Sequence, residues 1–162
     1  MFSGYGGLVP ETWEYSAINP ASAAPFGSGC PGNATVPVLA AEQGSRPWLG
    51  DTFAARVTNV GSNPFLNVPF VMLGDSRSSW GPLSLPLDLA FVGMIGCTAY
   101  TNAVVNQSIP NAGGAARWTL GVPNVTALAG SVVYVQAGVT SPGANPYGVS
   151  LSNACELRIG AK

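Results

Sequence analysis

Two pairs of carboxylates are the residues best suited to acid–base chemistry. Glu11 lies near Glu14, and Asp75 precedes Asp88. A glycoside hydrolase needs two carboxyl groups about 5–10 Å apart across a cleft, and nothing in the sequence places either pair in that way. Asp88 belongs to a Pro-Leu-Asp-Leu run that is typical of a structural position. The carboxylates therefore do not indicate an active site.

Histidine is absent from the chain. Without imidazole, Ser-His-Asp and Cys-His catalysis are excluded, together with the common zinc and copper sites. Calcium could use Asp75 with amide or backbone oxygens, but no Asp-x-Asp-x-Asp loop is present, and turn capping is the simpler role for Asp75. We predict a protein that is not an enzyme and that carries no metal and no other cofactor.

Three cysteines, Cys30, Cys97 and Cys155, lie far apart and show no CxxC or metal-knuckle spacing. One disulfide closing a long loop would stabilise the fold by about 3–5 kcal/mol, and it would form in an oxidising compartment. The alternative is three reduced cysteines in the core, since free cysteine is among the most buried residue types.

One polar segment with an aromatic residue, Asp75-Ser-Arg-Ser-Ser-Trp-Gly81, is a candidate ligand-contact loop. Sugar recognition stacks an aromatic ring on the apolar face of a sugar and uses short polar groups for the hydroxyls. Trp80, Trp48 and Tyr100 are therefore each candidates for contact with a glycan. The alternative for Trp80 is a structural plug at the edge of a sheet.

Charged residues make up only 8% of the chain, against about 25% in ordinary globular domains. The six basic residues are scattered singly and form no stripe, so we expect no nucleic-acid partner. A surface so poor in charge suits a lattice, a filament or an extracellular module better than the cytosol. No run of 18 apolar residues predicts a membrane span, and no signal peptide begins the chain, so we expect any signal to have been removed.

Twenty-one glycines and fourteen prolines divide the chain into short pieces that suit strands better than helices. Alternation of apolar and polar residues predicts half-buried antiparallel strands, and seven to nine of them are typical of a sandwich or barrel. Asn153 interrupts the apolar parity of the last strand and predicts a bulge near Ser152–Asn153. The turn clusters lie at 111–114 and 141–146, with a helical turn closed by Gly130 within 123–130. The predicted strands are 36–41, 52–58, 68–73, 98–105, 116–120, 133–140 and 149–159.

Residues 1–27 differ from the rest because they combine prolines, glycines and aromatic residues. We expect an extended N-terminal arm over 1–27 and a β-sandwich domain over 28–162. The arm either packs on its own domain or adds a strand to a neighbouring subunit through backbone hydrogen bonds. The residues of this possible assembly arm are Tyr5, Leu8, Val9, Trp13, Tyr15 and Ile18.

From Phe26 onward, the chain resembles a β-rich domain found at the C-terminal ends of large secreted proteins of environmental bacteria, planctomycetes especially. The resemblance implies secretion, a β-sandwich and a Cys30–Cys97 disulfide. Cys155 departs from the family pattern, and we expect it to be a free or intermolecular thiol. The matching stretches are Phe26-Gly-Ser-Gly-Cys-Pro-Gly32, Trp48-Leu-Gly-Asp-Thr-Phe53, Leu83-Ser-Leu-Pro-Leu-Asp-Leu89, Gly93-Met-Ile-Gly-Cys-Thr-Ala-Tyr100, Ser141-Pro-Gly-Ala-Asn-Pro146 and Leu151-Ser-Asn-Ala154.

The combined expectation is an all-β protein, a two-sheet antiparallel β-sandwich of Ig-like or jelly-roll-like type with an extended N-terminal arm. Its expected function is that of a non-catalytic structural module, secreted or at the cell surface, that assembles into a filament or lattice by strand addition. The expected partners are copies of itself or other surface proteins. The alternatives are a carbohydrate-binding or adhesion module and a sorting or anchoring domain of a larger secreted protein.

Overall fold

The computed structural model describes residues 20–31 and 35–162, and it confirms an all-β protein of sandwich type. Two 3-10 helices, η1 (Leu89–Val92) and η2 (Thr126–Leu128), accompany the strands. The strands are β1 (Ser22–Phe26), β2 (Val38–Ala41), β3 (Thr52–Thr58), β4 (Pro69–Gly74), β5 (Ser79–Trp80), β6 (Leu83–Ser84), β7 (Leu87–Asp88), β8 (Thr98–Ala99), β9 (Val105–Ser108), β10 (Ala115–Gly121), β11 (Val132–Thr140) and β12 (Val149–Arg158).

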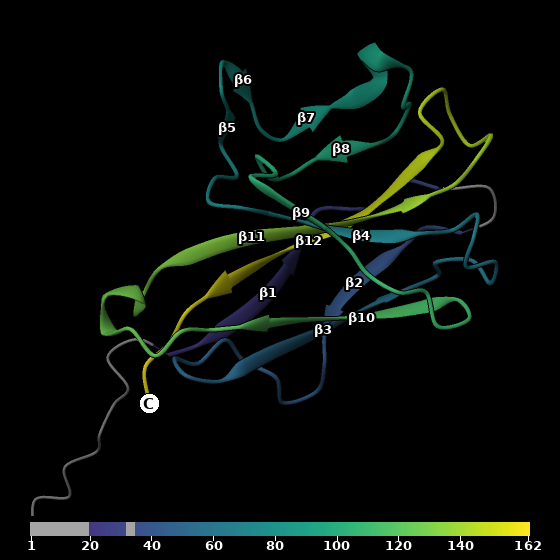
Figure 1. Cartoon of the computed structure of the whole chain (residues 1–162). Coiled ribbons are helices and arrows are strands. Elements are labelled where there is room, and N and C mark those ends of the chain that lie inside the picture. The colour runs from purple at the N-terminus through teal and green to yellow at the C-terminus, as the bar shows by residue number, and fades with distance from the viewer. Residues whose placement is uncertain (1–19, 32–34) are drawn as a thin grey trace, which may run out of the picture.

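Two antiparallel sheets form the sandwich (Figure 1). One sheet has five strands in the order β1-β12-β11-β4-β9, and the other has three in the order β10-β3-β2. With five and three strands, the two sheets together contain eight, which lies within the expected seven to nine. The total in the described residues is higher because β5 to β8 are additional strands of only two residues each.

The main core lies between the two sheets and is built by the predicted alternation. Phe53 and Val57 of β3 point into it, as do Val135 and Val139 of β11, and all four side chains are almost fully buried. Trp118 of β10 packs edge-on against Phe53, with the ring centroids 6.2 Å apart. Period-two patterning thus identified the inner faces of both sheets correctly.

A second, smaller core lies on the outer face of the five-stranded sheet. Residues 75–104, here called the cap, leave the sheet after β4 and return to it at β9, and Figure 1 shows β5 to β8 on this side of the sheet. Met94 and Cys97 of the cap pack with Cys30 and with Leu151 of β12. The protein therefore has three layers: the three-stranded sheet, the five-stranded sheet and the cap.

The predicted bulge in the last strand is confirmed, and it connects the two cores. Gln136 of β11 faces Ala154, whereas Gly138 faces Leu151, so Ser152 and Asn153 together oppose the single residue between them. The extra residue reverses the alternation along β12. As a result, Leu151 joins the outer core under the cap, whereas Cys155 lies in the main core.

One predicted strand, over 98–105, is wrong. This stretch forms two separate strands, β8 paired with β7 and β9 paired with β4, with a bend between them. Ala103 in the bend has a positive φ of 47°, and the Asn102 side chain accepts hydrogen bonds from the backbone N–H groups of Asp75 and Ser76. The bend lets the chain pass from the cap back to the sheet. The helical turn predicted in 123–130 is present as η2, with Ala129 as its C-cap and Gly130 following at positive φ.

Part of the segment expected to be an arm belongs to the sandwich. Within 1–27, residues 22–26 form β1 at one edge of the five-stranded sheet, where Ser22 faces Arg158 and Phe26 faces Ala154 of β12. The assembly residues Tyr5, Leu8, Val9, Trp13, Tyr15 and Ile18 lie outside the described residues. No helix in the described ranges is both long and apolar enough to cross a bilayer.

Candidate functional site

The three candidate ligand-contact aromatics do not share a surface. Trp80 lies in β5 of the cap and is 43% exposed, whereas Tyr100 is buried and its hydroxyl accepts a hydrogen bond from the Ser28 backbone N–H at 3.0 Å. Trp48 bridges to Gly160 near the C-terminus, which Figure 1 shows far from β5. A platform that stacks one glycan on all three rings is therefore not formed.

An aromatic pocket of about 460 Å³ lies beside Tyr100. The Arg77 guanidinium covers Phe26 at 5.4 Å and Tyr134 at 6.0 Å from the ring centroids, and it pairs with Glu156 at 3.3 Å. Because the chain's own arginine lies over the Phe26 ring and the other aromatic residue of the lining, Tyr100, is buried, the pocket offers little ring face on which a sugar could stack. The lining residues are Phe26, Gly27, Arg77, Ser78, Leu85, Pro86 and Tyr100.

A smaller cavity of about 190 Å³ lies at the end of the sandwich where β4 begins. Its walls carry hydroxyl, amide and apolar groups but no titratable side chain, so it has no group for general acid–base catalysis. The lining residues are Thr35, Asn59, Val60, Gly61, Leu66, Asn67, Val139, Ser141, Pro142 and Ser150.

The Asp75 and Asp88 side chains each accept a hydrogen bond from a nearby group within the cap. Asp75 accepts a hydrogen bond from the Asn102 side-chain amide at 2.6 Å, and Asp88 caps η1 by accepting one from the Ala90 N–H at 2.9 Å. Over residues 20–31 and 35–162, no three His, Cys, Asp or Glu side chains gather in the way that a metal ion would need. Glu11 and Glu14 lie outside the described residues.

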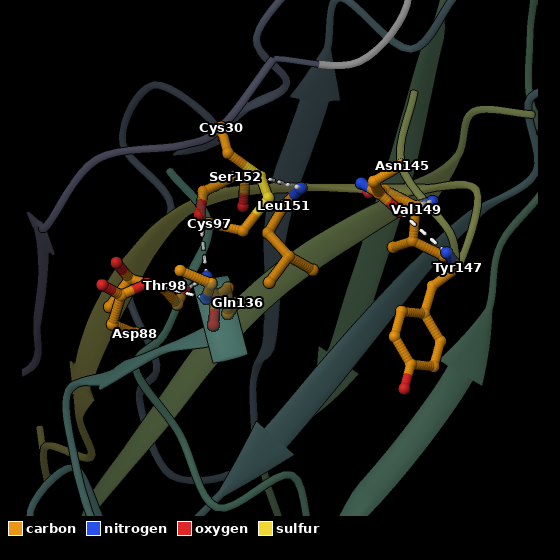
Figure 2. The surroundings of a disulfide bond; sticks show 11 residues. Cys30, Asp88, Cys97, Thr98, Gln136, Asn145, Tyr147, Val149, Leu151 and Ser152 are labelled. Atoms are coloured by element: carbon orange, nitrogen blue, oxygen red, sulfur yellow. Dashed lines mark hydrogen bonds between the residues drawn. A yellow bond between two sulfur atoms is a disulfide. The ribbon is translucent and has the colours of Figure 1, made fainter. Parts of the chain in front are cut away.

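The Cys30–Cys97 disulfide is confirmed, with an S–S distance of 2.04 Å. It ties the segment after β1 to the cap, and Figure 2 shows it beside Leu151 and above Gln136. The Leu151 backbone N–H donates to Cys30 Sγ at 3.2 Å, and the Cys30 N–H donates to the Leu151 carbonyl at 2.8 Å. The disulfide therefore fixes the cap to the bulged part of β12.

Cys155 is a free, buried thiol on the inner face of β12. Burial and, to a lesser extent, the adjacent Glu156 carboxylate together raise the pKa of this thiol to about 11. Only the thiolate is an effective nucleophile, so the native structure suppresses both alkylation and disulfide exchange at this position.

We expect iodoacetamide at pH 8.5 to modify Cys155 roughly a hundredfold more slowly in the native protein than in guanidinium-unfolded protein. The unfolded thiol ionises near pH 9, whereas the native thiol stays protonated up to about pH 11. Raising the pH through this window therefore favours the unfolded chain and lowers the free energy of unfolding. Mass spectrometry of time points measures the rates, and Cys155→Ala should show a shallower loss of stability. Equal native and unfolded rates would contradict this account.

The four edges of the two main sheets differ in how they are protected against pairing with another chain. In β1, Pro25 lacks a backbone donor, and β10 carries Arg117, which pairs with Glu42 at 2.9 Å. The outer edge of β2 is occupied because the Asn153 side chain bonds both the N–H and the carbonyl of Leu39, at 2.9 and 3.0 Å. Strand β9 has none of these features, and all four of its residues are exposed.

Two residues essential to this arrangement, Gln136 and Asn153, were not predicted in their roles. Gln136 alternates with apolar residues and therefore resembles an exposed position, yet it is fully buried and bonds three backbone groups beneath the cap. Asn153 did carry a signal, since it interrupts the parity of its strand. That signal predicted the bulge but not the two hydrogen bonds that the Asn153 side chain makes to the backbone of Leu39 in β2.

Comparison with known proteins identified no relative of this chain. No protein-family model matches the chain, and no curated protein or solved structure is significantly similar to it.

Proposed function

We propose that this protein is a non-catalytic structural module, secreted or at the cell surface, that assembles with copies of itself. The N-terminal segment of one copy adds a strand to β9 of the next copy. The observation that carries this proposal is the unprotected outer edge of β9. A sheet edge presents backbone donors and acceptors that favour pairing, and most proteins block such edges with charge, proline or a covering side chain.

The backbone of β9 has its free groups at alternate residues. The Ile109 N–H donates to the Pro69 carbonyl of the neighbouring segment at 2.9 Å. Because alternate residues of an antiparallel strand point to opposite sides, Val105 and Gln107 face β4, whereas Asn106 and Ser108 direct their N–H and carbonyl groups outward. An added strand would pair with these two residues.

The N-terminal segment has the length and composition for such a strand. Nineteen residues precede Pro20, and a chain of that length spans at most about 65 Å when extended. The ten residues of β12 cover about 33 Å, so the segment is long enough to reach a neighbouring sandwich. No charged residue lies between Asp88 and Arg117, so Glu11 and Glu14 of an incoming segment would meet no like charge on β9.

The proposed location rests on the disulfide and on the composition. Disulfides persist in oxidising compartments, which include the bacterial periplasm and the cell exterior. A surface with few charges is prone to association, which harms a free cytosolic protein but serves one that must pack into an assembly.

We expect the full chain to form high-mass species that deletion of residues 1–19 abolishes. Asn106→Pro should have the same effect because it removes an outward N–H without touching the β4 ladder. Asn106→Ala is the matched control, since it keeps the N–H and should assemble like the unaltered chain. Sedimentation velocity and electron microscopy provide the readouts.

High-mass species that persist after the deletion would contradict strand donation. A full chain that stays monomeric at all concentrations would contradict self-assembly altogether. Circular dichroism with a strand-type spectrum for every variant is the check that each one still folds.

A further inference from the structure

One end of the sandwich carries no charge. The loops 59–67, 109–114 and 141–148 lie at this end, on the right in Figure 1, and no charged residue occurs in 57–74, 89–116 or 118–155. The opposite end carries Arg46, Asp51, Arg158 and Lys162, with the Lys162 ammonium 2.6 Å from the Asp51 carboxylate. Charge is therefore distributed unevenly along the long axis of the sandwich.

Large apolar side chains project from this uncharged end and from the adjacent part of the cap. Phe65 is 91% exposed, Ile95 82%, Phe91 71%, Tyr147 61% and Leu66 53%. We call these five residues the apolar pole. Figure 2 shows the Tyr147 side chain directed away from the disulfide and the outer core.

The loops of the apolar pole adjoin one another. The Asn67 side chain donates to the Thr140 carbonyl at 3.1 Å, and the Thr140 hydroxyl donates to the Leu66 carbonyl at 2.6 Å. On the cap side, Gly93 lies against the ring of Pro146 so closely that a Cβ at this position would approach it to 2.9 Å. These contacts bring loop 59–67, loop 141–148 and the turn after η1 next to one another.

Side-chain hydrogen bonds hold the loops in the exposed conformation. Asn63 accepts from the N–H groups of Phe65 and Leu66, and the Asn145 side chain bonds the backbone of Tyr147 and Val149. These hydrogen bonds fix the backbone of both turns, and in this conformation Phe65 and Tyr147 are exposed. Exposure of these rings is thus a property of the local structure.

The exposed apolar area approaches that of an interface. Aromatic side chains contribute about 150–250 Å² each when buried, so the exposed fractions of the three rings correspond to roughly 350–550 Å². Ile95 and Leu66 bring the total towards the about 800 Å² per partner that a stable protein–protein contact buries. The largest apolar patch on a typical monomer is about 300–600 Å², and patches of that size or larger often mark an interaction site.

We infer that the apolar pole of one copy binds the apolar pole of a second copy in a symmetric, end-to-end contact. The five residues of the pole all lie in uncharged stretches of the chain, so their side chains can be buried against each other without an ion among them. The exposed carboxylate of Asp88, the N-cap of η1, has to stay outside this contact. A bilayer is the less suitable occupant because the pole has no Lys or Arg to engage lipid headgroups. This inference rests on the proposed self-assembly and adds a second contact to it, distinct from the β9 edge.

The test uses the chain without residues 1–19, in which the strand-donating contact is removed. We expect a concentration-dependent monomer–dimer equilibrium in sedimentation velocity, and a rise of at least about tenfold in the dissociation constant for Ile95→Glu and for Phe65→Ser. Val125→Glu is the matched control, since Val125 is 49% exposed beside η2 and away from the pole. Its dimer should persist.

The outcomes separate this contact from strand donation. A shortened chain that is monomeric at all concentrations, or pole variants that dimerise as well as the control, would overturn the end-to-end contact. That result would leave strand donation intact if the full chain still forms high-mass species. If the monomer instead binds phosphatidylcholine vesicles, and Ile95→Glu abolishes that binding, then the apolar pole binds a bilayer and not a second copy.

Discussion

Replacement of Gln136 by methionine is expected to lower the free energy of unfolding by about 3–5 kcal/mol. The Gln136 side chain accepts from the Tyr100 N–H at 3.0 Å and donates to the carbonyls of Thr98 and Ser152 at 2.9 Å. Methionine has a similar length and is apolar, so it fills the same space but bonds none of these groups. Each buried backbone group left without a partner costs about 1–3 kcal/mol.

Guanidinium denaturation monitored by tryptophan fluorescence measures the effect, and hydrogen exchange locates it. We expect the Tyr100 amide to exchange faster in Gln136→Met, because its acceptor is removed. Gln43→Met is the control, since Gln43 is exposed in the turn before β3, and it should change stability by less than about 0.5 kcal/mol. A Gln136→Met protein as stable as the control would show that the cap does not depend on this carboxamide.

Removal of the disulfide by Cys30→Ala together with Cys97→Ala is expected to cost about 4 kcal/mol. The bond closes a loop with a sequence separation of 67 residues, and the entropy of that loop in the unfolded chain accounts for this magnitude. Neither cysteine belongs to the main core, so we expect the sandwich to persist and the cap to open more often.

Calorimetry of the oxidised protein, the reduced protein and the double variant measures the loss of stability. Reduction and substitution should agree, because both remove the same cross-link. Cys155→Ala is the control, because it leaves the Cys30–Cys97 disulfide in place. Its stability should fall on reduction by as much as that of the unaltered protein. If the Met94 and Tyr100 amides are equally protected from hydrogen exchange with and without the disulfide, the expected opening of the cap is contradicted.

Local patterns in the sequence predicted six of the eight strands of the two main sheets and missed β1 and β9. Thr52–Thr58 alternates cleanly, and the structure places Phe53 and Val57 in the main core as that parity requires. The bulge at Ser152–Asn153 was also predictable, because a polar residue at an apolar position indicates a change of register. The Cys30–Cys97 disulfide was implied by the resemblance and not by spacing, since long separations do not distinguish among three pairings.

The prediction was least accurate where a strand is covered on both faces. Alternation in β11 suggested a half-buried strand, yet Gln136 on its outer face is fully buried beneath the cap. The strand expected over 98–105 failed for a related reason. Its residues have strand propensity, but Tyr100 and Thr101 are buried against the sheet and the chain bends there to rejoin β4.

The sequence by itself determined the class of the protein: turn residues and period-two runs favour strands, and the absence of histidine and the low charge apply in any fold. Only the tertiary structure decided that residues 75–104 fold back as a cap, that Asn153 occupies the edge of β2, and that β9 is left unprotected. Alternation reports which residues share one face of a strand, because that is a local property of the backbone. What covers the other face depends on contacts such as Gln136 to Thr98, which bring together residues distant in the sequence.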